Sequence, residues 1–581
     1  MTTSNPLNVT TLLTTILPDA VKHNKNFFSW YDYILFTTML SISGVIGIYF
    51  GCCGKKQDTT KEYLLGGKNM KVVPIAISLV ASHTSGITLL ALPADIYVYG
   101  ASYWLGCISM FILAFITVYV YLPVFYNLQL TSTYEYLGRR FDKRTRKCAS
   151  FLFALALFVY LPIVIYIPAL AFSAATGIDV HIITPIVCGV CIFYTTLGGL
   201  KGLVWSDTLQ FSITVGAMTT IFILGLKATG GISNVWQKSV EGERLDLFEQ
   251  KVCFHNFSFG LDFTKRESFW AIVVGLTIHW VAHTSVNQGC TQKFLSVSTL
   301  AESKRTLSAN LNCLAGTIYE DFLKGILTRK GVNKNAGVIL KVIVVLTGII
   351  STALVYVVEN LGSLLSISIG LGSVAHGPLL AMFTLGVLFP RANGKVKRPR
   401  FNLISNTILS LLGAFYGAMI SMLCMGSVIT TSNYYKSKNM LKYPTKPVSI
   451  DGCDFTVNAT IATEFTFYDV SFDPVILLLV VFTETGFEVN AIFRISFYWY
   501  TMIGAIIGII VGLIISYLSE KNDPPVPMKL LSPVTYPFLS EEHKNADTEY
   551  YGIREALQKV NLGETTLRNG EEKDEYVRRC L

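Results

Sequence analysis

The chain contains 581 residues, of which 51% are hydrophobic and only 15% are charged. A soluble domain carries about 25% charged residues, so the composition excludes an ordinary soluble protein and predicts a polytopic membrane protein. The net charge of +9 is spread over short connectors, where it reports on membrane topology and does not indicate a nucleic-acid partner. The sequence shows no nucleophile–base constellation, metal motif or phosphate loop, which argues against an enzyme.

Eleven apolar segments follow one another along the chain and predict an all-α membrane protein. A membrane-spanning helix needs about 20 mostly apolar residues, and the segments are close to that length. They cover residues 33–52, 72–97, 102–128, 150–176, 181–198, 203–228, 268–288, 336–358, 363–390, 404–429 and 497–518. Eleven crossings would place the two ends of the chain on opposite sides of the bilayer.

The charges of the connectors predict which of them are cytoplasmic and which are extracellular. Lys and Arg are concentrated in alternate connectors, at residues 55–71, 139–147, 324–334 and 391–400. Cytoplasmic loops carry an excess of Lys and Arg, so we expect an extracellular N-terminus at 1–32 and a cytoplasmic tail at 519–581. Three glycosylation sequons agree, because all fall in segments assigned to the outside, the last in a long outer loop at 430–496. They begin at Asn8, Asn256 and Asn458.

The second apolar segment, 72–97, is interrupted by six small or polar residues in a row, Ala81-Ser-His-Thr-Ser-Gly86. Unsatisfied polar groups in hydrocarbon cost several kcal/mol, so this stretch should face protein or water. Secondary transporters build ion sites from such interrupted helices, with unwound backbone carbonyls pointing at the cation. The alternative is a Ser/Thr-rich packing seam between helices.

Asp207 lies near the inner start of an otherwise uncharged span. Na⁺ is a hard cation that prefers oxygen ligands, and a nearby carboxylate offsets its charge. Asp207 is therefore a candidate for an ion site. The alternative is an N-capping or snorkelling carboxylate, because Lys201 is close in sequence.

Five histidines fall within predicted spans, where a lone His is a functional candidate by default. His279 and His283 share one helix face because they are four residues apart. They suggest cavity lining or structural packing, and a metal pair only weakly, since no carboxylate is near. His376 lies among Gly370, Gly372, Gly377 and Pro378, which suggests a break or a close helix crossing.

Several motifs carry a resemblance to a known family. In chain order they are YLLGGKNM, SLVASHTSGITLLALPADIYVYG, LTSTYEYLGRRFDKRTR, YTTLGGLKGLVWSDTLQ, SVNQGCTQKFLS, LNCLAGTIYEDF and GPLLAMFTLGVLFP. Together they span residues 62–390. The chain resembles the sodium:solute symporter family, closest to the branch that carries monocarboxylates, multivitamins and iodide.

The resemblance implies a leucine-transporter-like fold with two inverted five-helix repeats. Residues 33–52 would be an extra N-terminal helix and 391–518 the C-terminal helices. Residues 72–228 would form the first repeat, and 268–390 the second.

The resemblance also implies a function, sodium-coupled symport of a small organic anion across the plasma membrane, with Na⁺ as the coupling ion and no organic cofactor. The sequence does not indicate the substrate or the oligomeric state. The implied sodium ligands are Ala81, Thr84, Asp207, Thr306 and Ser308. The implied substrate cavity is lined by Ser82, His83, Ser85, His279, His283 and His376.

One interval departs from the family pattern. Between Arg305 and Lys324, both in basic stretches, the chain has only 18 residues, whereas two crossings need about 40. Compared with the family, about two helices of the second repeat are missing. Arg305 takes the place of an oxygen ligand, and its permanent positive charge would repel Na⁺. An alternative function is therefore a transport-deficient splice form or a regulatory paralogue without a complete sodium site.

Overall fold

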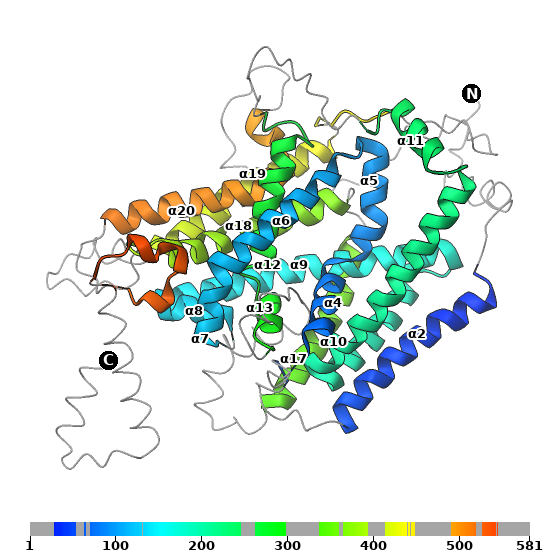
Figure 1. The fold of residues 1–581 in the computed structure, drawn as a ribbon, viewed down its shortest axis with the longest axis horizontal. Helices are drawn as coiled ribbons and strands as arrows, with labels where there is room; N and C mark the ends of the chain where they lie inside the picture. The colour runs from blue at the N-terminus through cyan, green and yellow to red at the C-terminus, as the bar shows by residue number, and fades with distance from the viewer. Residues whose placement is uncertain are drawn as a thin grey trace, which may run out of the picture.

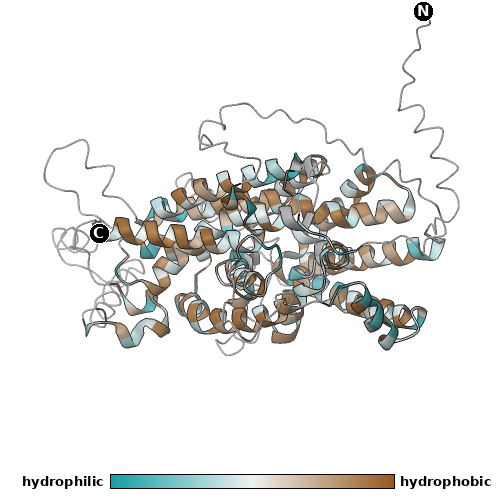
Figure 2. Cartoon of the chain, turned by 90° about the horizontal axis from the view of Figure 1, so that it is seen from above, coloured by the Kyte–Doolittle hydropathy of each residue, from teal (hydrophilic) through white to brown (hydrophobic). Residues whose placement is uncertain are grey.

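The computed structural model describes the chain from Phe28 to His543 with gaps. The described residues are 28–53, 63–64, 70–130, 132–245, 262–297, 336–358, 364–392, 413–438, 440–441, 443–447, 490–518, 526–541 and 543. Helices account for all the regular secondary structure in these ranges, as the sequence predicts. Apolar residues run along most of the helix lengths, as expected for helices in contact with lipid and with one another (Figure 2).

The first helix, α2 (Trp30–Ile48), continues into a π-helical turn, η1 (Tyr49–Cys53), and lies at one edge of the molecule against α10 (Val180–Ala228) (Figure 1). The two helices approach closely at Gly47, where an added Cβ would lie 2.7 Å from the Cα of Tyr194. A glycine is therefore required at this crossing.

The second predicted span is broken, as its sequence predicts. Helix α4 (Val72–His83) ends at Thr84, whose φ/ψ of −93°/89° is not helical. The chain resumes as the π-helical turn η3 (Ile87–Ala91) and α5 (Leu92–Tyr99), and the two halves are bent by 60°. The run of small and polar residues thus forms a break in the helix.

The remainder of the first predicted repeat contains six further helical stretches and one long kinked helix. The stretches are η4 (Ser102–Leu105), α6 (Gly106–Ile116), η5 (Thr117–Tyr121), α7 (Leu122–Leu128), α8 (Thr133–Arg140) and α9 (Lys143–Thr176). Helix α10 kinks at Gly199, which has a φ of +54° that side chains rarely adopt. The kink separates the two spans predicted at 181–198 and 203–228.

The second half of the described chain contains both short and long helices. They are α11 (Ile232–Glu241), η6 (Ala271–Leu276), α12 (Thr277–Thr284), α13 (Gln288–Phe294), α17 (Ala336–Val358), α18 (Leu364–Leu388), α19 (Gly413–Ser437), η11 (Ala491–Arg494), η12 (Phe497–Trp499), α20 (Tyr500–Leu518), η13 (Met528–Leu530) and η14 (Pro533–Phe538). Helices α18, α19 and α20 pack on one another at the opposite end from α2 (Figure 1).

The glycines of α18 mark a close helix crossing. A Cβ added to Gly377 would lie 3.1 Å from the Cα of Gly504 in α20, and α18 runs unbroken through this point. Of the two predictions for these glycines, the close crossing is confirmed and the break is wrong.

The predicted cytoplasmic tail contributes to the packed body. Leu530 O accepts a hydrogen bond of 2.8 Å from the Tyr136 hydroxyl of α8, and Ser532 N donates to Val387 O of α18 over 3.0 Å. Residues 526–541 are therefore anchored to α8 and α18.

Eight helices in the described ranges are long and apolar enough to cross a membrane, or nine when the bent pair is counted as one span. All eleven predicted segments overlap a helix, because α10 contains two of them and α12 is a shorter apolar helix. The protein is thus multi-pass, while its crossing number, orientation and domain boundaries stay predictions. Outside the described residues lie the predicted glycosylation sites Asn8, Asn256 and Asn458, the predicted ligands Thr306 and Ser308, and the short interval 306–323.

Candidate functional site

The helix break opens onto a cavity of about 480 Å³ between α4, α9 and α10. Three of the predicted sodium ligands, Ala81, Thr84 and Asp207, line it together. The other lining residues are Phe28, Ser85, Gly86, Leu89, Leu90, Pro168, Ala171, Phe172, Gln210, Phe211 and Thr214. The structure therefore brings together every predicted sodium ligand that it describes.

Thr84 is the C-cap of α4, and its side chain is hydrogen-bonded to the last turn of that helix. Its N–H donates to Val80 O over 3.0 Å and to Ala81 O over 3.2 Å, and its hydroxyl donates to Val80 O over 3.0 Å. These bonds hold the last turn of α4 closed. After Thr84 the backbone is no longer helical, and residues Ser85 and Gly86 line the cavity.

Asp207 points across the interface between α10 and α4. Its Oδ2 accepts a 2.6 Å hydrogen bond from the Ser78 hydroxyl of α4, and the carboxylate is 17% exposed. Asp207 lies well past the kink at Gly199 that begins the second half of α10, so it is not a capping residue. Of the two structural alternatives for Asp207, the N-cap is wrong, and the snorkelling carboxylate stays a prediction.

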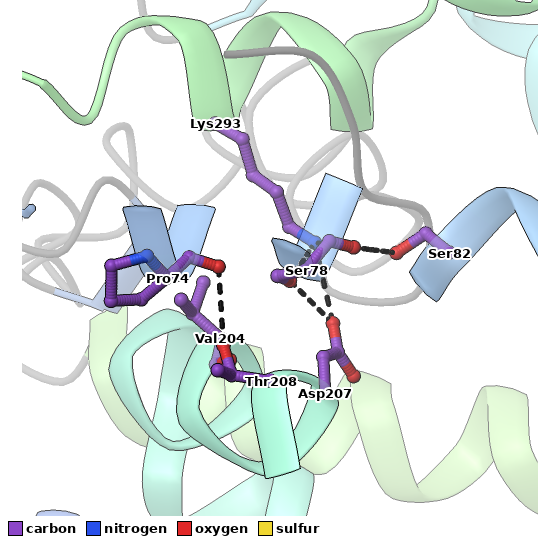
Figure 3. A network of polar contacts seen from close by, with 7 residues as sticks. All are labelled: Pro74, Ser78, Ser82, Val204, Asp207, Thr208 and Lys293. Atoms are coloured by element: carbon purple, nitrogen blue, oxygen red, sulfur yellow. Dashed lines mark hydrogen bonds and ion pairs between the residues drawn. The ribbon is translucent and has the colours of Figure 1, made fainter. Parts of the chain in front are cut away.

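Lys293 of α13 reaches the same carboxylate and was not singled out from the sequence (Figure 3). Its Nζ lies 3.3 Å from Asp207 Oδ2, 3.3 Å from Ser82 Oγ and 3.2 Å from Ser78 O, and it also donates to Ser78 Oγ. The lysine side chain is fully buried. The signal that could have found it is its place in the motif SVNQGCTQKFLS, where it is the one charged residue.

The predicted histidines form a second cluster on α12 and α18. The ring centroids of His283 and His376 lie 4.0 Å apart, and those of His279 and His283 lie 4.9 Å apart. His279 Nδ1 lies 3.0 Å from Thr501 Oγ1, which in turn lies 2.8 Å from Ser373 Oγ. These three histidines do not line the cavity at the break.

His83 connects the helix break to this cluster. Its ring packs edge-on against Trp280 of α12, with centroids 5.4 Å apart. Among the residues that the structure describes, neither the buried His83 Nε2 nor the buried Trp280 Nε1 has a hydrogen-bond partner. Buried polar nitrogens normally have partners, so these two are candidates for contact with a polar ligand.

The remaining predicted substrate residues lie at the break itself. Ser85 lines the cavity, and the Ser82 hydroxyl donates to Ser78 O over 3.0 Å beside Lys293. The predicted substrate set is thus divided between the cavity and the histidine cluster. In the described part of the chain, no group of three or more His, Cys, Asp or Glu side chains has the arrangement of a metal site.

A third polar cluster surrounds Arg266, just before η6. Arg266 donates to Asp95 of α5, lies over the Tyr99 ring at 3.4 Å, and has its Nε 3.8 Å from Glu267 Oε1. Burial raises the pKa of Glu267 to about 7, with Asp95 adding to the effect and Arg266 opposing it. This cluster joins α5 to the start of the seventh predicted span.

Comparison with known proteins gives sodium-coupled transporters. Residues 63–304 match the family model described as the sodium:solute symporter family. Sodium-coupled monocarboxylate transporter 1 of Xenopus laevis is 30% identical, over 85% of this chain and 86% of the relative. The sodium-dependent multivitamin transporter of Oryctolagus cuniculus is 28% identical, over 86% of this chain and 84% of the relative.

A solved structure has the same fold. It is the substrate-bound outward-open state of a Na⁺-coupled sialic acid symporter, which superimposes with a TM-score of 0.61. The match covers 85% of this chain and 98% of that chain at 19% sequence identity. The likeness supports the leucine-transporter-like fold expected from the sequence.

Proposed function

This chain belongs to the sodium:solute symporter family, and from that premise we propose that it carries a small organic anion of the monocarboxylate or vitamin type together with Na⁺ across the plasma membrane. Sodium-coupled solute symport is the activity of the family. The observation that carries the proposal for this chain is the cavity at the helix break, which Ala81, Thr84 and Asp207 line together.

The chemistry of the cavity suits a sodium ion. Na⁺ needs oxygen ligands, and Thr84 and Ser85, which carry backbone and hydroxyl oxygens, line the cavity together with Asp207. A charge inside a low-dielectric bundle interacts strongly with an ion, so a single carboxylate at the break favours a cation over a neutral solute. Binding of the ion at the helix break would be coupled to a movement of α5 relative to α4.

The chemistry beside the cavity suits an organic anion. The unpartnered nitrogens of His83 and Trp280 can each present an N–H to a carboxylate, and charged acceptors form the stronger hydrogen bonds. Matching relatives are named for monocarboxylates and for multivitamins, which supports the same substrate class.

Tracer uptake tests the proposal. Cells lacking related transporters would express the full chain, and uptake of labelled lactate, biotin and iodide would be measured in Na⁺ and in choline buffer. We expect sodium-dependent uptake of at least one of the organic anions. Trp280→Phe, which removes the indole N–H and keeps an aromatic ring, should raise the KM for that anion several-fold while leaving the dependence on Na⁺ unchanged.

The alternative is a transport-deficient or regulatory form. The named relatives are all transporters, so the comparisons give this alternative no support. Normal surface expression without sodium-dependent uptake of any of the three tracers would favour it over symport.

A further inference from the structure

Lys293 is held in a small cage of oxygens. Its ammonium contacts the backbone oxygen and the hydroxyl of Ser78, the hydroxyl of Ser82 and the carboxylate of Asp207 (Figure 3). The three contacts other than that to the Ser78 hydroxyl measure 3.2–3.3 Å. Hydroxyl, carbonyl and carboxylate oxygens around a buried positive charge are also the ligand types that a sodium ion takes.

This arrangement depends on one carboxylate. The lysine side chain is fully buried, and a buried charge costs several kcal/mol unless it is paired. In the described part of the chain, the only carboxylate that forms an ion pair with Lys293 is Asp207. Asp207 is therefore needed to keep the ammonium where it is.

The same carboxylate lines the cavity with the predicted sodium ligands Ala81 and Thr84. One negative charge cannot fully compensate two buried cations, since the cations repel each other strongly in a low-dielectric interior. An ion that binds to Asp207 and the lysine that already binds it are therefore competitors.

We propose that Lys293 is the resident cation of this site: its ammonium holds Asp207 when Na⁺ is absent, and Na⁺ binds by displacing it. This inference rests on the proposed sodium-coupled function and specifies which cation occupies the site when Na⁺ is absent. The lysine would lower the apparent affinity for Na⁺, because only the fraction of molecules with a displaced ammonium is competent to bind. It would also keep the buried carboxylate neutralised in the sodium-free protein.

The test is equilibrium binding of ²²Na⁺ to the purified full chain, which does not require transport. Lys293→Gln keeps a polar side chain of similar length but removes the charge. We expect its half-saturating Na⁺ concentration to fall about tenfold below that of the unsubstituted chain. Lys293→Arg, the matched control, keeps a cation in the cage and should bind Na⁺ no more tightly than the unsubstituted chain.

The outcomes separate this proposal from the proposed function. Equal half-saturation in Lys293→Gln and the unsubstituted chain, or no binding by either, would overturn the competition. Binding by Lys293→Gln alone would support it and show that the unsubstituted chain is not sodium-coupled. Tighter binding by both Lys293→Gln and Lys293→Arg would also overturn it, because charge would then not be the cause.

A second measurement uses the unsubstituted chain and so tests the proposal even if the variants misfold. Acylation of lysines in the purified protein would be followed by mass spectrometry in Na⁺ and in choline buffer. If Na⁺ displaces the ammonium from its cage, the rate of Lys293 modification should rise several-fold in Na⁺, with Lys238 on the exposed surface of α11 as the internal reference. An unchanged ratio between the two lysines would overturn the proposal.

Discussion

Asp207 is the only charged residue between Lys201 and Lys227 of α10, and its environment explains why that charge is retained. The carboxylate has a hydroxyl donor in Ser78 and a cation in Lys293, and it borders the cavity at the helix break. The sequence predicts Asp207 because an isolated charge in an apolar span is a local signal. It does not predict Lys293 as the partner, because that contact joins residues 86 positions apart.

Replacing the Asp207 charge should impair sodium coupling. In Asp207→Asn we expect the half-saturating Na⁺ concentration for uptake to rise about tenfold or more, because a carboxylate interacts strongly with an ion in a low-dielectric bundle. Thr214→Val is the matched control, since Thr214 lines the same cavity and its hydroxyl donates to Gln210 O of its own helix. It should leave the half-saturation unchanged.

Surface expression must be measured beside uptake in this comparison. Asp207→Asn leaves the Lys293 ammonium buried without a carboxylate, which is destabilising in itself. The double variant with Lys293→Gln removes that conflict and should restore expression without restoring sodium dependence. Unchanged sodium dependence of uptake in Asp207→Asn would show that Asp207 is structural.

Glu267 predicts a pH dependence of stability. Its pKa in the folded protein, about 7, lies above the usual value of 4.5, so the folded state favours the protonated carboxyl. The stabilisation is fully present below the unfolded pKa and is lost as the pH rises through the folded pKa. Between about pH 5 and about pH 8, the melting temperature should fall by roughly 3 °C from this group.

Thermal unfolding of paired variants would measure this effect. Glu267→Gln cannot ionise, so it should flatten the pH dependence relative to the unsubstituted chain. Asp262→Asn is the control: a hydrogen bond from Thr264 lowers the pKa of Asp262, which is therefore ionised over the whole range and contributes no slope. Identical slopes in Glu267→Gln and the unsubstituted chain would contradict the prediction.

At the scale of elements, the sequence predicts what is local. The break between α4 and α5 follows from six consecutive small or polar residues, and the kink of α10 falls between two predicted spans at Gly199. The i, i+4 spacing of His279 and His283 predicts their shared face. The approach of His376 to them does not follow from local spacing and was expected only from the family resemblance, because helix packing brings α18 to α12 from a distant part of the chain.

Helix α2 offers a matched test of close packing. A Cβ on Gly47 would lie 2.7 Å from Tyr194, whereas a Cβ on Gly44, one turn earlier, has no neighbour within 4 Å. Gly47→Ala should therefore destabilise the protein by about 1–3 kcal/mol through overpacking against α10. Gly44→Ala should be neutral or slightly stabilising, since Ala favours a helix over Gly. Melting temperatures of the two variants that agree within error would argue against the α2–α10 crossing.

At the scale of the whole molecule, the order of helices follows from apolar segments, but their membrane orientation depends on charge. The helices and their packing are compatible with either orientation, because a fold can be inserted both ways. The distribution of Lys and Arg among the connectors distinguishes the two orientations, and it predicts an extracellular N-terminus and a cytoplasmic tail.

Site-directed labelling tests that orientation. Lys143, at the exposed start of α9, lies in a connector predicted to be cytoplasmic, and Lys238, on exposed α11, lies in one predicted to be extracellular. In a background without native cysteines, Lys238→Cys should react with a membrane-impermeant maleimide on intact cells. Lys143→Cys should react only after the cells are permeabilised. Labelling of Lys143→Cys on intact cells would invert the topology, and the anchored segment 526–541 would then lie outside as well, because it packs on α8 and α18 at the same end of the bundle.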